Sequence, residues 1–130
     1  MCLASIVMSD ASSALIVDFG SSTAEITRSK PPPDRLLAGS PEHTARNYFS
    51  DSTGRFFAGT WESTPGRWRV RYSENEFCHI TQGRVVIEDE QSRRWEFKAG
   101  DSFVIASGFS GTWHVIETLR KLYVIHEPAS

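Results

Sequence analysis

Glu76 and Lys121 are the side chains of this sequence that could work together as an acid and a base. Both lie in segments that alternate as β-strands do, and Lys121 shares one strand face with Tyr123 and Ile125. Burial raises the pKa of a carboxyl group and a nearby ammonium lowers it again, so such a pair can be tuned for catalysis. The alternative is a buried structural salt bridge, or a lysine tip that reaches solvent at a rim.

A set of aromatic side chains predicts where a small molecule would bind near that pair. Trp68, Tyr72, Trp113 and Tyr123 have the strand positions that would place them on the same inner face as Glu76. An apolar pocket with a few polar groups is the usual form of a small-molecule site. We therefore expect these side chains to contact a ligand, although aromatic residues at such positions also serve as core.

Residues 67–72 alternate strictly, in the order Arg-Trp-Arg-Val-Arg-Tyr. Successive strand residues point to opposite faces, so one face of this segment is cationic and the other aromatic. Arg67, Arg69 and Arg71 then lie either in solvent, against carboxylates of a neighbour, or as an anion-binding row inside a cavity. The sequence leaves these interpretations open.

Short strands separated by glycine-containing turns must position these residues. The segments rich in β-branched and aromatic residues are 56–61, 67–72, 76–82, 84–88, 93–97, 102–105, 112–116 and 120–126. Regular short strands of this kind predict an all-β sandwich or barrel. Residues 1–47 are rich in Ser, Thr, Ala and Pro, and we expect an N-terminal arm there, with one possible strand at 14–19. Residues 48–130 would form the barrel.

Size and charge exclude several classes of protein. The chain has 130 residues and a formal net charge of −2, so we expect one domain that does not bind nucleic acid. No apolar run is long enough to span a membrane, and no Lys or Arg precedes Arg28, as a secretory signal would require. Two cysteines cannot form a disulfide framework. We therefore expect a soluble, cytoplasmic domain.

Two blocks of residues carry a family resemblance. In residues 66–83, Glu76 is followed by six residues and then Gly83, and in residues 100–111 the small residue Ala106 stands between Gly100 and Gly108. These blocks resemble the two signature motifs of the cupin superfamily. The resemblance implies an antiparallel β-barrel of the jelly-roll type, also called a double-stranded β-helix.

A narrower resemblance rests on shorter motifs: Ala-Gly-Thr-Trp-Glu at 58–62, Asn-Glu-Phe-Cys-His at 75–79, Gly-Thr-Trp at 111–113 and Arg-Lys-Leu-Tyr-Val-Ile at 120–125. Over roughly residues 33–127 the sequence is similar to the Cupin_3 or DUF861 group of single-domain, RmlC-like cupins. That group includes ethanolamine-utilisation-like and ureidoglycine-aminohydrolase-like relatives. The resemblance also implies a homodimer, because an open sheet edge favours pairing between subunits.

The same resemblance implies a metal site of which this sequence keeps one ligand. Metal-dependent cupins usually hold a divalent transition metal with two His and one Glu of the first block and one His of the second. The His pair would fall at positions 70 and 72, or 69 and 71, and none of these positions holds His. The fourth position is Gly111, so only Glu76 remains. We expect no cofactor, with a divalent transition metal as the alternative.

Substitute metal ligands are conceivable around Glu76, and the candidates are Cys78, His79 and His114. On a regular strand His79 points away from the face of Glu76, so a β-bulge would be needed to bring them together. We expect Cys78 to be a small core residue. His43 and His126 are expected at the surface or in an interface.

The sequence predicts a cupin that binds a small polar organic molecule in the barrel without the usual metal ligands. Two alternatives stay open. One is an aminohydrolase- or isomerase-like enzyme, either with a metal held by substitute ligands or metal-free with Glu76 and Lys121 as acid and base. The other is an accessory subunit whose barrel serves mainly to dimerise. Fold resemblance does not decide among them.

Overall fold

A computed structural model describes residues 15–129, and all the regular secondary structure in that range is β-strand. The strands are β1 (Glu25–Ser29), β2 (Leu36–Gly39), β3 (His43–Ser50), β4 (Phe56–Ser63), β5 (Gly66–Arg71), β6 (Asn75–Asp89), β7 (Arg94–Lys98), β8 (Ser102–Ile105) and β9 (Ser110–His126). The predicted all-β class is confirmed. Over the same range, the structure contains no helix of the length and apolarity needed to cross a bilayer.

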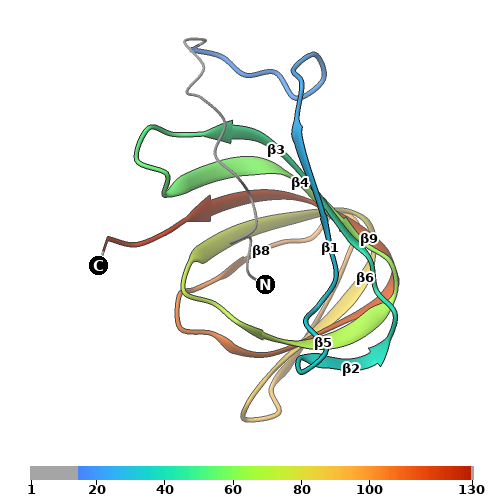
Figure 1. The fold of residues 1–130 in the computed structure, drawn as a ribbon. Coiled ribbons are helices and arrows are strands. Elements are labelled where there is room, and N and C mark those ends of the chain that lie inside the picture. The colour runs from blue at the N-terminus through green and yellow to red at the C-terminus, as the bar shows by residue number, and fades with distance from the viewer. Residues whose placement is uncertain (1–14, 130) are drawn as a thin grey trace.

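The nine strands form one antiparallel sheet built around its two longest members. β6 pairs with β9 along most of its length, and β9 pairs on its other side with β5 and then with β4. β3 and β1 continue the sheet beyond β4, β2 lies beyond β5, and β7 and β8 lie beyond β6. The sheet curls around a common interior as a half-barrel, which confirms the cupin-type antiparallel architecture (Figure 1).

The prediction of a turn at Gly83 is wrong, because β6 runs through this residue. Gly83 has a positive φ of 88°, and the pairing of β6 with β9 shifts register on both sides of it. A Cβ at this position would lie 2.1 Å from the Thr118 carbonyl oxygen, so only glycine lets the two strands pass so closely here. The segments predicted at 76–82 and 84–88 are therefore one bulged strand.

The N-terminal region contributes strands that the sequence did not reveal. Residues 15–19 form no strand, and Leu15 is fully exposed; residue 14, where that strand was expected to begin, lies outside the described residues. β1 pairs with β3 and β2 pairs with β5, despite the intervening prolines. β3 spans the expected boundary between residues 47 and 48. The described part of the arm is thus continuous with the main sheet.

The inner face of the half-barrel is apolar and aromatic. In β5 the side chains of Trp68 and Val70 are buried, as is Tyr72 just after the strand, whereas Arg69 and Arg71 are exposed. This one-sided burial confirms the predicted alternation. The rest of the apolar core comes from the same face of the other strands: Ala45, Trp61, Cys78, Ile80, Val85, Ile87, Ile105, Trp113, Val115, Leu119, Tyr123 and Ile125.

Candidate functional site

Glu76 on β6 and Lys121 on β9 meet inside the half-barrel. The Lys121 Nζ lies 2.7 Å from the Glu76 Oε2, and both side chains are fully removed from solvent. Neighbouring strands place them on one face, since β6 and β9 are paired and both residues point inward. A charge buried this deeply must be compensated by its partner, because an unpaired ion in such surroundings costs several kcal/mol (about 3–5).

Tyr72 donates a hydrogen bond to the other oxygen of the buried carboxylate. Its hydroxyl donates a hydrogen bond of 2.7 Å to the Glu76 Oε1, so both carboxylate oxygens have a donor. Burial, together with the negative charge of Glu76, holds the pKa of Tyr72 well above its usual range. Tyr72 therefore stays protonated and acts here as a hydrogen-bond donor rather than as a base.

Indole rings and a thiol enclose the Lys121 ammonium on its other sides. Nζ lies 4.8 Å from the ring centre of Trp61 and 4.4 Å from that of Trp113, distances at which a cation is attracted to an aromatic face. It also lies 3.5 Å from the Cys78 Sγ. Burial, with Glu76 nearby, raises the pKa of Cys78 to about 12, so this thiol is neutral at physiological pH. The surroundings of the pair are those of a structural salt bridge.

Tyr123, a predicted ligand contact, bonds within the protein. Its hydroxyl donates to the Asn47 Oδ1 at 2.8 Å, and the Asn47 amide in turn donates to Ser50 at 2.8 Å. Gly59 makes room for this contact, because a Cβ there would lie 2.7 Å from the Tyr123 hydroxyl. Burial raises the pKa of Tyr123 above its usual value, so the group remains a donor. Sequence analysis did not single out Asn47.

The residues around Glu76 do not fit the divalent metal that many cupins carry. Both oxygens of Glu76 already accept hydrogen bonds, and residues 15–129 contain no group of three His, Cys, Asp or Glu that could hold an ion. At Gly111, the position of the usual fourth ligand, a Cβ would lie 2.0 Å from the Glu88 carbonyl oxygen. No larger side chain fits that backbone without a shift of β6.

The weaker ligand candidates lie apart from Glu76 or are poor ligands. His79 bonds through its Nδ1 to Ser102 at 2.7 Å, on the neighbouring strand β8. His114 is opposite Arg67 on β5 and Val86 on β6, whereas the residue of β9 opposite Glu76 is Ile125. Cys78 shares the interior with Glu76 but is a neutral thiol, which binds metals weakly compared with a thiolate.

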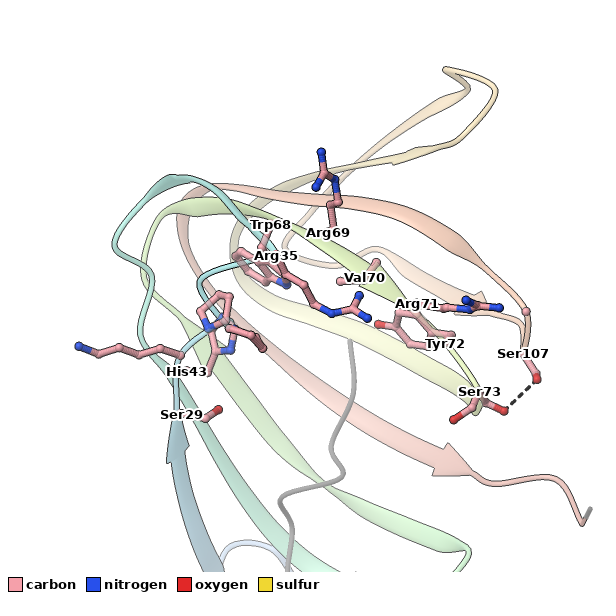
Figure 2. Close-up of a pocket in the computed structure, with 14 residues that line it drawn as sticks. Ser29, Arg35, His43, Trp68, Arg69, Val70, Arg71, Tyr72, Ser73 and Ser107 are labelled. Carbon is pink, nitrogen blue, oxygen red and sulfur yellow. Dashed lines mark hydrogen bonds between the residues drawn. The ribbon is translucent and has the colours of Figure 1, made fainter.

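A pocket of about 820 Å³ lies beside this interior, and we call it the mouth pocket. Its walls come from the β1–β2 connection, β5 with the residues that follow it, and the turn before β9 (Figure 2). Trp68 and Tyr72 line it, as the sequence predicted for ligand contacts, whereas Glu76, Trp113, Lys121 and Tyr123 lie outside its lining. The other lining residues are Ser29, Lys30, Pro31, Pro32, Arg35, His43, Arg69, Val70, Arg71, Ser73, Ser107 and Gly108.

His43 is part of this lining and is buried, so of the two expected positions, at the surface or in an interface, the first is wrong. Its side chain is 7% exposed, because β3 places it against the rings of Trp61 and Trp68, at centroid distances of 5.0 and 4.6 Å. Burial, and then the charge of Lys121, lower its pKa to about 4. His43 is therefore neutral at pH 7, and its Nε2 has no hydrogen-bond partner among the described residues. His126 is exposed, as expected.

Comparison with solved structures identifies the fold family. A DUF861-family protein of unknown function from Pseudomonas syringae pv. tomato is 27% identical, with a TM-score of 0.71, over 78% of this chain and 44% of that protein. The EutQ protein of Clostridium difficile is 17% identical, with a TM-score of 0.60, over 67% of this chain and 64% of that protein. This chain thus spans less than two thirds of both.

A third solved structure is matched over its whole length. The putative ethanolamine utilization protein Q from Salmonella typhimurium is 15% identical, with a TM-score of 0.60, over 83% of this chain and 100% of that protein. At such identity the likeness shows the fold alone. No curated protein matches the chain. Residues 50–123, more than half of the chain, match the family of EutQ-like cupin domains, Cupin_3. The chain therefore belongs to the EutQ-like cupin family.

Proposed function

We propose that this cupin binds a small polar organic molecule in the mouth pocket and does so without a metal. The observation that carries the proposal is the make-up of the pocket floor. Trp68 and Val70 line it with apolar side chains, and Tyr72 and His43 line it with rings that carry a polar atom. A pocket of this size, mostly apolar with a few fixed polar groups, suits one small organic ligand.

The polar groups of the floor are pre-positioned. Tyr72 gives its proton to Glu76, which leaves the lone pairs of its hydroxyl oxygen to accept a hydrogen bond from a ligand. The neutral His43 lines the same pocket, and its buried Nε2 has no hydrogen-bond partner among the described residues. A ligand group that satisfies a buried, unpartnered nitrogen gains more than one that merely replaces water. The buried ion pair thus acts through Tyr72, which it orients.

The strand-to-loop hydrogen bonds that shape the pocket support a preformed site. The Arg69 amide donates to the Arg35 carbonyl oxygen at 2.9 Å, which ties the β1–β2 connection to β5. On the opposite side, the Gly108 amide donates to the Tyr72 carbonyl oxygen at 2.8 Å. A preformed pocket loses less ordering entropy on binding than a mobile one.

Binding of the model compounds benzamide and benzoate, followed by NMR in the presence of a chelator, tests this proposal. Both carry a polar head on an apolar ring, and we expect at least one to shift the indole resonance of Trp68. Ser29→Trp fills the rim of the pocket opposite His43, with which Ser29 is paired across β1 and β3. Ser52→Trp, at an exposed loop position away from the pocket, is the matched control.

The two variants separate the outcomes. Loss of the shift in Ser29→Trp and its retention in Ser52→Trp would support binding in the mouth pocket. Shifts that survive in Ser29→Trp, or that require added divalent metal, would overturn the proposal. Both substituted serines are exposed, so neither change disturbs the core.

An enzyme is the second candidate, because a hydrogen-bond chain leads from the pocket into the interior. It runs from Tyr72 through Glu76 to Lys121, with both links 2.7 Å long. In such an enzyme Tyr72, which lines the pocket, would touch the substrate, and the buried pair would position it. For any substrate found to turn over, an unchanged kcat in Tyr72→Phe would exclude this chain of residues from catalysis.

A further inference from the structure

Two groups of exposed or half-buried cationic side chains in this protein differ in whether they contact a carboxylate. Arg46 and Arg120 both contact Glu62, and the arginines of the β6–β7 hairpin contact Glu96, Asp89 and Glu88. In contrast, the mouth pocket is lined by the exposed cations Lys30, Arg35, Arg69 and Arg71. Over residues 15–129, none of these forms an ion pair, and no Asp or Glu lines the pocket.

Arg35 and Arg71 lie on either side of the Tyr72 ring in the pocket (Figure 2). Figure 2 shows the guanidinium of Arg35 extending toward Tyr72, with Arg71 beside that ring and Arg69 turned away from the other lining residues. Arg35 is held at its position by the turn that closes on the Pro32 carbonyl oxygen, to which the Arg35 amide donates at 2.9 Å. Proline restricts the backbone of that connection, so the backbone that carries Arg35 is stiff.

We propose that the ligand of the mouth pocket is a small organic anion, whose carboxylate or phosphate group is held by Arg35 and Arg71. The inference rests on the proposed function and adds the chemical class of the ligand. A guanidinium presents paired N–H donors in a planar fork that matches the oxygens of either group. The apolar body of the ligand would lie on Trp68 and Val70.

The floor beneath the arginines favours an organic anion over an inorganic one. Trp68 and Val70 are apolar, and a bare phosphate or sulfate ion would leave them without a partner. His43 is neutral and unpartnered, so it can bond to a polar substituent on the body of the ligand. The positive charge and the apolar surface are thus at different depths of the same pocket. This arrangement matches a molecule that has an anionic head group and an apolar body.

Titration calorimetry at low ionic strength, with benzoate, phenyl phosphate and benzamide as probes, tests the proposal. These compounds share a ring and differ in the charge of the head group. We expect at least one anion to bind about tenfold more tightly than benzamide, since a charge-assisted hydrogen bond contributes on that order. Comparing benzoate with phenyl phosphate identifies which anionic group fits. The preference should diminish with added salt.

Single arginine substitutions localise the effect. Arg35→Gln and Arg71→Gln should each weaken the preferred anion about tenfold and leave benzamide within about twofold. Arg69→Gln, in the same pocket wall but turned away, should change the affinity much less. Arg55→Gln removes an exposed arginine that does not line the pocket and should have no effect. All four side chains are exposed, so the variants keep the fold.

The outcomes distinguish this inference from the proposed function. Equal binding of benzamide and both anions, or affinities unchanged in Arg35→Gln and Arg71→Gln, would overturn anion recognition and leave a pocket for small polar molecules. Failure of all three probes to bind would overturn both proposals. An equal loss in Arg69→Gln and Arg55→Gln would also count against it, because it would reflect net charge rather than a site.

Discussion

The interior of the half-barrel and the mouth pocket both bring cations near indole rings, but the cations differ in burial and in pairing with a carboxylate. In the interior, Lys121 lies between two indoles, and its charge is matched by Glu76 at 2.7 Å with no exposure of either side chain. In the mouth pocket, Arg35 and Arg71 are exposed and unmatched within residues 15–129. Tyr72 lies between the two regions and contacts both.

This difference indicates how the two regions divide their tasks. A buried ion whose hydrogen-bonding capacity is filled by the protein has little left to offer a ligand. An exposed cation without a protein partner can exchange its water for a ligand's oxygen at small cost. We infer that Glu76 and Lys121, the residues most suggestive of catalysis in the sequence, serve chiefly to fix the pocket floor.

Lys121→Met should have the largest effect, because it removes one partner of the buried pair. Glu76 would keep only its bond from Tyr72. We expect the free energy of unfolding to fall by about 3–5 kcal/mol, measured by urea denaturation. The double variant Glu76→Leu/Lys121→Met should recover much of that loss, since an apolar pair can replace a buried ion pair.

The exposed pair between Arg84 and Glu96 is the matched control for that experiment. Arg84→Gln should change the unfolding free energy by less than about 1 kcal/mol, because solvent screens exposed charges. A loss for Lys121→Met as small as that for Arg84→Gln would mean that water reaches the interior. The contrast between a dry interior and a solvent-exposed mouth pocket would then be wrong.

His43 should make stability depend on pH. Its pKa is lowered from 6.5 to about 4 in the folded protein. Between these two pH values, His43 is therefore mostly protonated in the unfolded chain and mostly neutral in the folded one. Stability contributed by the neutral ring is present above pH 6.5 and is lost as the pH falls toward 4. The loss amounts to about 3 kcal/mol at most.

Urea denaturation of His43→Gln between pH 7.5 and 4 measures this contribution. Between these two pH values, the free energy of unfolding should fall by about 2–3 kcal/mol less in the variant than in the unchanged protein. His126→Gln, which alters an exposed histidine on β9, should follow the unchanged protein. Parallel pH profiles for all three proteins would show that His43 is hydrated and would weaken its assignment to the pocket floor.

Strict alternation made part of this arrangement predictable from the sequence. Since successive strand residues point to opposite faces, residues 67–72 and the spacing of Lys121, Tyr123 and Ile125 were enough to predict their faces. The meeting of Glu76 with Lys121 followed from the same rule. The rule failed at Gly83, because a glycine at a bulge and a glycine in a turn leave the same trace in a sequence.

The mouth pocket could not be predicted in the same way. Arg35 and His43 reach it through the pairing of β2 with β5 and of β1 with β3, contacts between segments far apart in sequence. The proline-rich connection carries no strand periodicity from which this pairing could be inferred. One signal was present for His43: it alternates with Ala45 and Asn47 on the buried face of a strand, with polar residues between them.

Tyr123→Phe should have the smallest effect and bears on the same division, because the sequence predicted this residue as a ligand contact. The change removes the hydroxyl that donates to Asn47 at 2.8 Å, a bond between neutral groups, so unfolding should become easier by about 1 kcal/mol. Tyr72→Phe removes a bond to a carboxylate and should cost more, about 1.5–3 kcal/mol.

Of these two tyrosines only Tyr72 lines the mouth pocket, so the affinity for benzoate should change in Tyr72→Phe and stay constant in Tyr123→Phe. A weaker affinity in Tyr123→Phe would extend the binding site into the interior, and the buried side chains of β9 would then have to be counted as ligand contacts.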